Sequence, residues 1–203
     1  MAVGKRIFDI AFSLLILVLA APFFLLCMFA VKLSSAGPIF YAHPRIGCNG
    51  KPFRCLKFRT MYLNADAKLQ PLLASDPALM QEWKTYFKLK ADPRITPIGK
   101  FLRKTSLDEL PQVWNVFKGD MSIVGPRPLT QHEVVYYLKD KSSKILSVRP
   151  GLTTLWIILG RNGLSLEERI KLEEFYVANR SFWLDCKLIV QTILLMIFPK
   201  GAY

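Results

Sequence analysis

The stretch from Ile10 to Val31, IAFSLLILVLAAPFFLLCMFAV, contains 22 residues and no charged side chain. As a continuous helix it would extend about 33 Å, which is enough to cross a hydrocarbon core of about 30 Å. It is longer than the apolar region of a signal peptide, and no small-residue cleavage site follows it. The stretch therefore predicts a membrane anchor, to which we assign residues 1–35.

Pro22 lies in the middle of this stretch, where proline removes a backbone hydrogen bond and bends a helix. Basic residues flank both sides, with Lys5 and Arg6 before the stretch and Lys32 at its end. Orientation therefore cannot be taken from the excess of cytoplasmic positive charge that is usual in membrane proteins. Composition alone favours a kinked crossing helix, and a helix that turns back to the same face stays open.

The whole chain is both basic and apolar, with a net charge of +13 and a mean hydropathy of +0.25. This combination favours a protein that lies against anionic lipid or handles phosphorylated ligands. Lysine and arginine are spread along the chain without an RNA-binding or zinc-finger pattern, so we expect no nucleic acid partner. The four cysteines form no CxxC pair and are expected to be free thiols in the reducing cytosol.

Residues 36–203 are expected to form one domain on the cytosolic side. Short strands are predicted at 39–41 and 53–58, around the turn at 47–50, and helical character at 64–90. Ser165 and Glu168 form a capping box that opens a helix reaching about Asn179. The apolar stretch 182–198 is short for a span and suits an interfacial helix. The predicted fold class is α+β, mostly helical, with short strands and interfacial amphipathic helices.

The adjacent carboxylates Asp108 and Glu109 are the first candidates for chemistry. Ser106 and Glu109 fit a capping box, which would place the pair in a first helical turn. Alternatively, Pro111 begins the helix and the pair lies in the loop before it. In both cases the helix dipole is expected to keep the carboxylates ionised. For an arbitrary Asp-Glu pair, the ordinary role is that of solvated capping acids.

Basic residues accompany the pair. Arg103 lies just upstream, the GPRP turn at 125–128 holds Arg127 on a stiff backbone, and Lys57 and Arg59 alternate along a strand. Cations that face ionised carboxylates are suited to a site where Mg²⁺ and a diphosphate lie between them. Asp185, an acid among apolar residues, is either a partner for basic residues or a surface acid.

Several long blocks in order resemble the bacterial sugar transferases, the monotopic phosphoglycosyl transferases, over essentially the whole chain. They are SSAGPIFYAHPRIGCNGKPFRCLKFRTM (34–61), TSLDELPQVWNVFKGDMSIVGPRP (105–128), RPGLTTLW (149–156), GRNGLSLEERIKLEEFYV (160–177) and FWLDCKL (182–188). The resemblance implies transfer of a sugar 1-phosphate from a nucleotide (UDP) sugar to polyprenyl (undecaprenyl) phosphate, with release of UMP. It implies a cytosolic-face catalytic domain on the bacterial inner membrane, at the first membrane step of exopolysaccharide, O-antigen or glycoprotein assembly.

The resemblance also implies roles for individual residues. The position that matches Asp108 attacks the sugar-bearing phosphorus to give an aspartyl-phosphosugar, the position that matches Glu109 holds Mg²⁺, and Asp185 falls on the family's C-terminal acid. We assign phosphate contacts to Lys57, Arg59, Arg103 and Arg127. Two rivals remain: direct attack by the lipid phosphate with both acids on metal, and a membrane-anchored scaffold without enzymatic activity.

The membrane segment is also read differently in this light. Because nucleotide sugar is cytosolic and must meet a lipid phosphate at that same surface, we expect a re-entrant helix-break-helix that bends at Pro22. Family members often have serine before this proline, whereas this chain has Ala21. The PGLTTLW and GRN blocks resemble the branch that handles hexoses such as galactose or glucose. Anionic inner-leaflet lipids are expected partners, and a homo-oligomer stays open.

Overall fold

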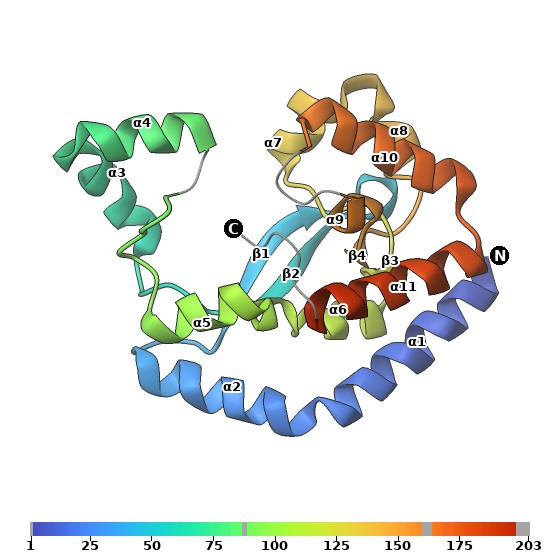
Figure 1. Cartoon of the computed structure of the whole chain (residues 1–203), viewed down its shortest axis with the longest axis horizontal. Helices are drawn as coiled ribbons and strands as arrows, with labels where there is room; N and C mark the ends of the chain where they lie inside the picture. Colours follow the sequence, from blue (N-terminus) through green and yellow to red (C-terminus); the bar gives the residue numbers. More distant parts are fainter. Residues whose placement is uncertain (1, 87–88, 160–163, 198–203) are drawn as a thin grey trace. The chain divides into compact units, whose positions relative to one another are not determined.

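The computed structural model describes residues 2–86, 89–159 and 164–197 (Figure 1). The chain divides into two compact units, neither continuous in sequence. Unit 1 comprises Met1–Ala21, Ala42–Leu56 and Pro111–Tyr203, and unit 2 comprises Pro22–Tyr41 and Lys57–Leu110. The boundary predicted at residue 35 is therefore not a boundary between these units, and the assignment of residues 1–35 as the anchor stays a prediction.

Most described residues are helical. Unit 1 contains α1 (Ala2–Leu19), η1 (Cys48–Gly50), α6 (Gln112–Lys118), β3 (Ser122–Val124), α7 (Gln131–Glu133), η3 (Val134–Leu138), η4 (Lys139–Lys141), α8 (Ser142–Ile145), β4 (Gly151–Thr153), α9 (Leu155–Leu159), α10 (Leu166–Asn179) and α11 (Phe182–Ile197). Unit 2 contains α3 (Ala65–Ser75), α4 (Pro77–Tyr86), α5 (Pro97–Thr105) and η2 (Leu107–Glu109), and α2 (Ala21–Ser34) starts at its edge. The mostly helical α+β class is confirmed.

The predicted strands form a hairpin of β1 (Phe40–Ile46) and β2 (Pro52–Phe58). The first strand is longer than the sequence indicated, because residues 42–46 continue it up to the turn. Asn49 and Gly50 have positive φ in that turn, a conformation that asparagine and glycine adopt most readily. The hairpin ends near Lys57, so its end supplies a candidate site residue.

Unit 1 is built around two short parallel strands, β3 and β4, which pair Ser122 with Gly151 and Val124 with Thr153. Fully buried side chains from α6, α10 and α11 pack around them, among them Val116, Tyr176 and Leu188. The predicted capping box is confirmed: the Ser165 side chain accepts from the Glu168 N–H and α10 ends at Asn179. This core fixes α10 and α11, which supply Glu173 and Asp185.

The first turns of α1 belong to unit 1 through polar contacts as well as apolar ones. Arg6 donates to the carbonyls of Val116 and Phe117 at the end of α6, at 2.7 and 2.6 Å. The buried Asp9 accepts from the Ser122 hydroxyl and the Ile123 N–H. Cations are favourable at a helix C-terminus, where carbonyls lack partners. The start of the apolar segment is therefore held to the folded body.

The apolar segment breaks where the proline predicted it. Helix α1 ends at Leu19, α2 begins at Ala21, and Pro22 occupies the first turn of α2, where a missing N–H costs nothing. Among the described residues no single helix is long and apolar enough to cross a membrane. The pair Val3–Leu19 and Ala21–Ser34, bent by 64°, reaches the required length and composition only together (Figure 1).

Helix α2 packs one face and exposes the other. Cys27 and Val31 are buried against Phe58 and Leu102 in the core of unit 2. The opposite face leaves large apolar side chains in the open, namely Phe23, Leu25, Leu26, Phe29 and Leu33. Contiguous exposed apolar surface of this kind marks a contact with lipid or with another protein.

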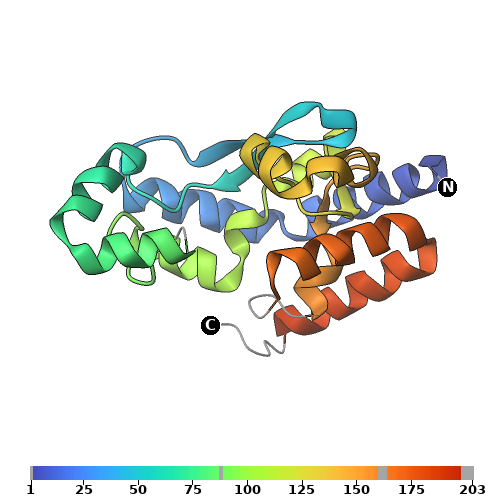
Figure 2. The same ribbon diagram turned by 90° about the horizontal axis from the view of Figure 1, so that it is seen from above.

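The remaining helical predictions are confirmed with altered bounds. The segment 64–90 forms two helices, α3 and α4, that end and begin around Asp76 and lie side by side (Figure 2). Residues 87–88 lie outside the described residues. The C-terminal apolar stretch is helical from Phe182 to Ile197, and residue 198 lies outside the described residues.

Candidate active site

Asp108 and Glu109 lie in η2, a single 3-10 turn that follows α5. Ser106 ends α5 with φ 58°, and the N–H of Glu109 donates to the Ser106 carbonyl. The Ser106 side chain makes no capping hydrogen bond, so the predicted capping box is wrong. The second alternative is nearer, since α6 begins at Gln112, directly after Pro111. The serine does not cap because its backbone is left-handed, whereas an N-cap residue is extended.

The turn is held by its apolar neighbours. Leu107 and Leu110, on either side of the acidic pair, pack against the core of unit 2 that includes Phe58 and Leu102. The two leucines fix the backbone between them, so the carboxylates are presented by a short, anchored segment. A side chain on an anchored segment loses little entropy when it binds a ligand.

Lys57, at the end of β2, reaches Glu109. Its Nζ lies 2.6 Å from Glu109 Oε1, and the Glu109 side chain is 41% exposed. The residue that we predicted to face the carboxylates therefore contacts one of them directly. Because this ion pair is partly open to solvent, a phosphate or metal can replace either partner at modest cost.

Asp108 is nearly buried, and its burial has an electrostatic consequence. Burial raises the pKa of the Asp108 carboxyl, Lys57 and Arg103 oppose that rise by attraction, and Glu109 adds to it by repulsion. The helix dipole was expected to keep the carboxylates ionised, and that expectation stays a prediction; the pKa of Asp108 is raised because desolvation of the charged form outweighs the favourable charges. A poorly solvated carboxylate beside two cations is more basic than an exposed one.

Arg103 is positioned by α5 and by Thr60. Its Nε donates to Thr60 Oγ1 at 2.9 Å, which leaves the rest of the guanidinium available. Helix α5 can approach this strand end only because residue 99 is glycine: a Cβ there would overlap the Thr60 carbonyl. Thr96 starts the helix by accepting from the Gly99 N–H at 2.9 Å. Thr60, Thr96 and Gly99 thus support the site, and the sequence analysis missed them.

Arg59 makes contacts that the sequence analysis did not predict, and its assignment as a phosphate contact stays untested. Its buried guanidinium donates to the carbonyls of Ala36 and Ser35, at 2.7 and 2.6 Å, just after α2. Residues 57 and 59 were expected to share a face, but β2 ends at Phe58, so the alternation stops there. Arg59 therefore caps the end of α2. Lys57 is directed at the acidic pair, whereas Arg59 is not.

Arg127 belongs to unit 1, where its guanidinium lies 5.5 Å from the centre of the Trp156 ring. Its backbone N–H donates to Glu173 Oε1 at 3.1 Å. Glu173 is 7% exposed, and burial raises the pKa of its carboxyl to about 8. Glu173 was not predicted; the signal available was an acid at a core position of an otherwise amphipathic helix. The GRN block, at residues 160–162, lies outside the described residues.

Asp185 also belongs to unit 1 and is a buried partner of basic and polar groups. It accepts from Lys5 Nζ at 2.6 Å and from the Tyr176 hydroxyl at 2.8 Å. Burial is the main cause that raises the pKa of Tyr176, so the phenol keeps its proton for this bond. Of the two roles considered for Asp185, the partner for a basic residue is the one observed.

The donor set at the acidic turn suits one kind of metal. No three His, Cys, Asp or Glu side chains gather into a metal-binding group in the part of the chain that the structure describes. Structural zinc needs such a group, whereas Mg²⁺ commonly takes one or two carboxylates and completes its shell with water and substrate phosphates. The partly exposed carboxylate of Glu109, next to Asp108, fits this second pattern.

A carboxylate pair flanked by cations, on a chain with two exposed apolar helices, suits a protein that handles phosphorylated ligands at a membrane. The particular family is shown by comparison: the model of the bacterial sugar transferase family matches residues 1–199, and the chain belongs to this family.

Its relatives agree with this assignment. The exopolysaccharide production protein ExoY of Sinorhizobium fredii is 47% identical over 99% of this chain and 88% of its own length. The undecaprenyl-phosphate galactose phosphotransferase of Salmonella typhimurium is 44% identical over 98% of this chain. The UDP-glucose:undecaprenyl-phosphate glucose-1-phosphate transferase of Klebsiella pneumoniae is 38% identical over 99% of this chain. The chain spans only 41% and 42% of the length of the last two.

Proposed function

We propose that the chain transfers a sugar 1-phosphate, with galactose or glucose as the sugar, from a UDP-sugar to undecaprenyl phosphate. The names of the relatives supply the substrate class. The observation that carries the proposal is the nearly buried Asp108 beside Glu109. Lys57 is paired with Glu109, and the positive charge of Arg103 attracts Asp108. A carboxylate of this kind can attack phosphorus, and the cations beside it compensate the negative charge that develops in the reaction.

In the first step a carboxylate oxygen of Asp108 attacks the phosphorus that bears the sugar. A new oxygen–phosphorus bond forms, the bond from that phosphorus to the bridging oxygen breaks, and UMP leaves with the electron pair. Burial helps, because fewer water molecules must leave the carboxylate before it attacks. Lys57 and Arg103 offset the negative charge that accumulates on the phosphoryl oxygens.

In the second step an oxygen of undecaprenyl phosphate attacks the same phosphorus. The bond to the Asp108 oxygen breaks, the carboxylate is regenerated, and the product is a polyprenyl diphosphate sugar. Splitting the transfer in this way lets one site serve a water-soluble donor and a lipid acceptor in turn. Charges remain balanced throughout, because no proton has to be moved.

Glu109 would hold Mg²⁺ together with substrate phosphate oxygens, and the metal would supply neutralisation of the diphosphate charge. Lys57 would then exchange Glu109 for a phosphate oxygen, which its partial exposure permits. We retain Arg127 as a phosphate contact on the strength of the resemblance. Arg59 is left out, since both of its terminal nitrogens donate to backbone carbonyls after α2.

The site would operate at the cytosolic face of the inner membrane, with α1 and α2 as a re-entrant pair. Large apolar side chains are exposed along both helices, including Leu15 and Val18 on α1 and Phe23 and Phe29 on α2. The bend at the break supports a chain that returns to the face it entered. Both basic flanks would then remain on the cytosolic side.

Labelling without the lipid acceptor tests the chemistry. The protein is incubated with Mg²⁺ and UDP-galactose or UDP-glucose labelled in the sugar, then denatured and washed. We expect one of the two to leave label on wild type and on Asp66→Asn, an exposed acid of the same unit, and none on Asp108→Asn. An active protein that retains no label would instead support direct attack by the lipid. A folded Asp108→Ala that transfers no sugar phosphate but keeps its function in glycan assembly would support a scaffold.

Cysteine labelling tests the re-entrant geometry. The four native cysteines are replaced, and single cysteines are placed at Val3 and Ala36, two exposed positions that flank the apolar segment. We expect an impermeant reagent to modify both from the cytosolic side of inverted membrane vesicles. Modification of the two from opposite sides would restore the crossing helix.

A further inference from the structure

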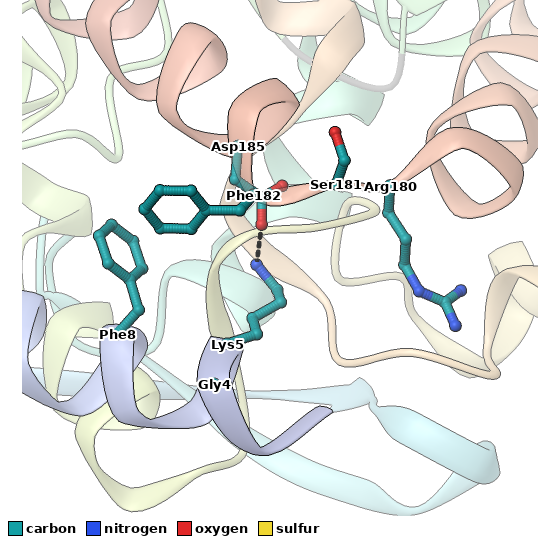
Figure 3. Close-up of a pocket in the computed structure, with 7 residues that line it drawn as sticks. All are labelled: Gly4, Lys5, Phe8, Arg180, Ser181, Phe182 and Asp185. Atoms are coloured by element: carbon teal, nitrogen blue, oxygen red, sulfur yellow. Dashed lines mark hydrogen bonds and ion pairs between the residues drawn. The ribbon is translucent and has the colours of Figure 1, made fainter. Parts of the chain in front are cut away.

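A cavity of unit 1, remote in sequence from the acidic turn, has the chemistry of a headgroup site. It has a volume of about 360 Å³ and lies between the first turns of α1 and α11 (Figure 3). Its lining residues include Lys5 and Phe8 from α1, Arg180 and Ser181 between α10 and α11, and Phe182 and Asp185 from the first turn of α11. Volumes of this order accommodate small ligands or part of a larger amphiphile.

The cavity has an apolar side. The rings of Phe8 and Phe182 meet edge to face, with centroids 5.7 Å apart. In Figure 3 both rings lie together on one side of the Lys5–Asp185 ion pair, and Arg180 extends on the other side. A ligand that fills this space would therefore have an apolar part against the rings and a polar part toward the cations.

The polar side carries one positive charge in excess, since Lys5 and Arg180 face a single carboxylate, Asp185. Both oxygens of Asp185 already accept hydrogen bonds, from Lys5 and Tyr176, so this acid is neutralised locally. Arg180 uses Nη1 to donate to the Val177 carbonyl, and among the described residues it forms no ion pair. Its remaining N–H groups are suited to an oxyanion, and guanidinium binds phosphate in a bidentate manner.

Two further donors point to the same kind of ligand. The Ser181 oxygen accepts from the Leu184 N–H, which leaves the hydroxyl hydrogen to donate. Lys5 has three N–H donors and gives one to Asp185. Each of the three residues therefore keeps hydrogen-bond donors for an anionic ligand while the Lys5–Asp185 pair stays intact.

Exposed apolar side chains on the two helices of the cavity indicate that the anion belongs to a lipid. Trp183 is 80% exposed next to Phe182, and Val3 and Ile7 are exposed on the turns of α1 that carry Lys5, although on another face of that helix. A free phosphate would leave these apolar side chains exposed to water, whereas the acyl chains of a lipid would cover them. Tryptophan in particular is enriched at the level of lipid headgroups.

We infer that this cavity binds the phosphodiester headgroup of an anionic phospholipid, with Arg180 as the main charge contact and Phe8 and Phe182 against the first acyl carbons. The inference rests on the proposed function only in that both place the chain at a membrane. It adds a binding site that the transfer reaction does not use. Its role would be to seat the start of α1 and α11 at an anionic surface.

The test measures lipid retention by native mass spectrometry of the full chain. The protein is exchanged into mixed micelles that contain equal amounts of phosphatidylglycerol and phosphatidylcholine with the same acyl chains, without any substrate. We expect wild type to retain phosphatidylglycerol preferentially. Arg180→Gln should lower that preference by about tenfold, in line with the loss of a charge-assisted contact.

Matched variants separate this contact from general effects. Arg54→Gln, in the same unit, removes an arginine that also donates to a single backbone carbonyl, and it should keep the preference. Arg180→Lys should keep part of it, which also guards against loss through misfolding. Equal preference in wild type and Arg180→Gln would overturn the inference, as would equal retention of phosphatidylcholine by wild type.

Inorganic phosphate distinguishes a lipid site from a free-anion site. Added at millimolar concentration, it should not displace the retained phosphatidylglycerol, and displacement would overturn the lipid assignment. Failure here and failure of the proposed reaction are distinguishable: Asp108→Asn should lose sugar label and still retain phosphatidylglycerol. The acidic turn and this cavity lie in different units and share no residue.

Discussion

Among the described residues, each unit contains one lysine–carboxylate pair with an N–O distance of 2.6 Å, Lys57–Glu109 in unit 2 and Lys5–Asp185 in unit 1. The distances are equal, but the surroundings are not. The Asp185 side chain is 6% exposed and both of its oxygens are occupied, whereas the Glu109 side chain is 41% exposed and bound through one oxygen. The saturated pair joins two helices, and the open pair is free to exchange its partner for a ligand. The hydrogen bonds that a carboxylate already accepts and its exposure, more than the N–O distance, therefore distinguish a structural ion pair from one that can bind a ligand.

The neighbours of the two pairs extend the contrast. Beside the open pair, Asp108 is desolvated and attracted by cations, and burial raises the pKa of its carboxyl. In unit 1, Glu173 is buried still more completely and accepts a backbone N–H of Arg127. Asp185, Asp108 and Glu173 thus differ in how far neighbouring groups compensate for the burial of the carboxylate. A different response to substitution is therefore expected for each.

The largest effect is expected for Asp108→Asn. Turnover should fall by roughly 10³-fold or more, because an amide is a far poorer nucleophile toward phosphorus. The free energy of unfolding should not fall and should rise slightly at neutral pH, because the variant no longer buries a charge whose pKa is raised. Steady-state rates and denaturant unfolding measure the two quantities. A loss of activity that tracks a loss of stability would remove Asp108 from the chemistry.

The next effect concerns Glu173 and appears as a pH dependence of stability. The folded state holds this proton up to a pKa of about 8, whereas the unfolded chain releases it near 4.5. Between these values the unfolded state binds fewer protons, so stability falls as pH rises, by up to about 1.4 kcal/mol per unit. Glu173 lines a cavity together with Arg127, Arg169 and Glu133, and attraction by Arg127 limits the rise of its pKa and hence the fall in stability.

Glu173→Gln should flatten this slope, because the amide keeps the acceptor for the Arg127 N–H and does not ionise. Unfolding followed at pH 5, 6, 7 and 8 provides the measurement. Parallel curves for wild type and the variant would show that Glu173 is ionised throughout, contrary to the cause given for its pKa. The comparison isolates burial without a compensating side-chain charge, the condition that Asp185 escapes through Lys5.

A smaller loss is expected for Asp185→Asn. The variant leaves the Lys5 ammonium without its counter-charge and weakens the bond from Tyr176, which should cost about 1–3 kcal/mol of stability. Glu167→Gln serves as the control, because its pair with Lys171 lies on the surface and should contribute less than about 0.5 kcal/mol. Thermal or denaturant unfolding gives both values. Equal losses in the two variants would contradict the role assigned to the buried pair.

Much of this could be predicted from the sequence, and the reasons are physical. Pro22 predicted the break because proline acts locally on its own helix, and Ser165 with Glu168 predicted a helix start because capping spans only three residues. The hairpin was found from alternation and turn residues. Each of these signals lies within a few positions along the chain.

The errors and omissions arose where tertiary contacts decide. The carbonyls that hold Arg59 come from residues 35 and 36, so no spacing around Arg59 could announce them. The residue types at positions 106 and 109 allow a capping box, but the left-handed backbone conformation of Ser106 prevents it. Lys5 and Asp185 are separated by almost the whole chain, and their pairing had no local signal. The acidic pair itself was found because its two carboxylates are adjacent in the sequence, whereas the residues that contact them are distant in it.

The smallest effect, and the most diagnostic for the open pair, is expected for Lys57→Gln. Lys57 lowers the pKa of Asp108 by attraction, against the rise that burial causes. Removing the cation should raise that pKa further and move the acid limb of the pH–rate profile to higher pH, since only the ionised carboxylate attacks. Lys57→Arg, which keeps the charge, should leave the limb near its wild-type position. If instead Lys57→Gln lowered the rate equally at every pH, Lys57 would act on the substrate phosphates alone, and the open pair would be a binding device and not a means of tuning the nucleophile.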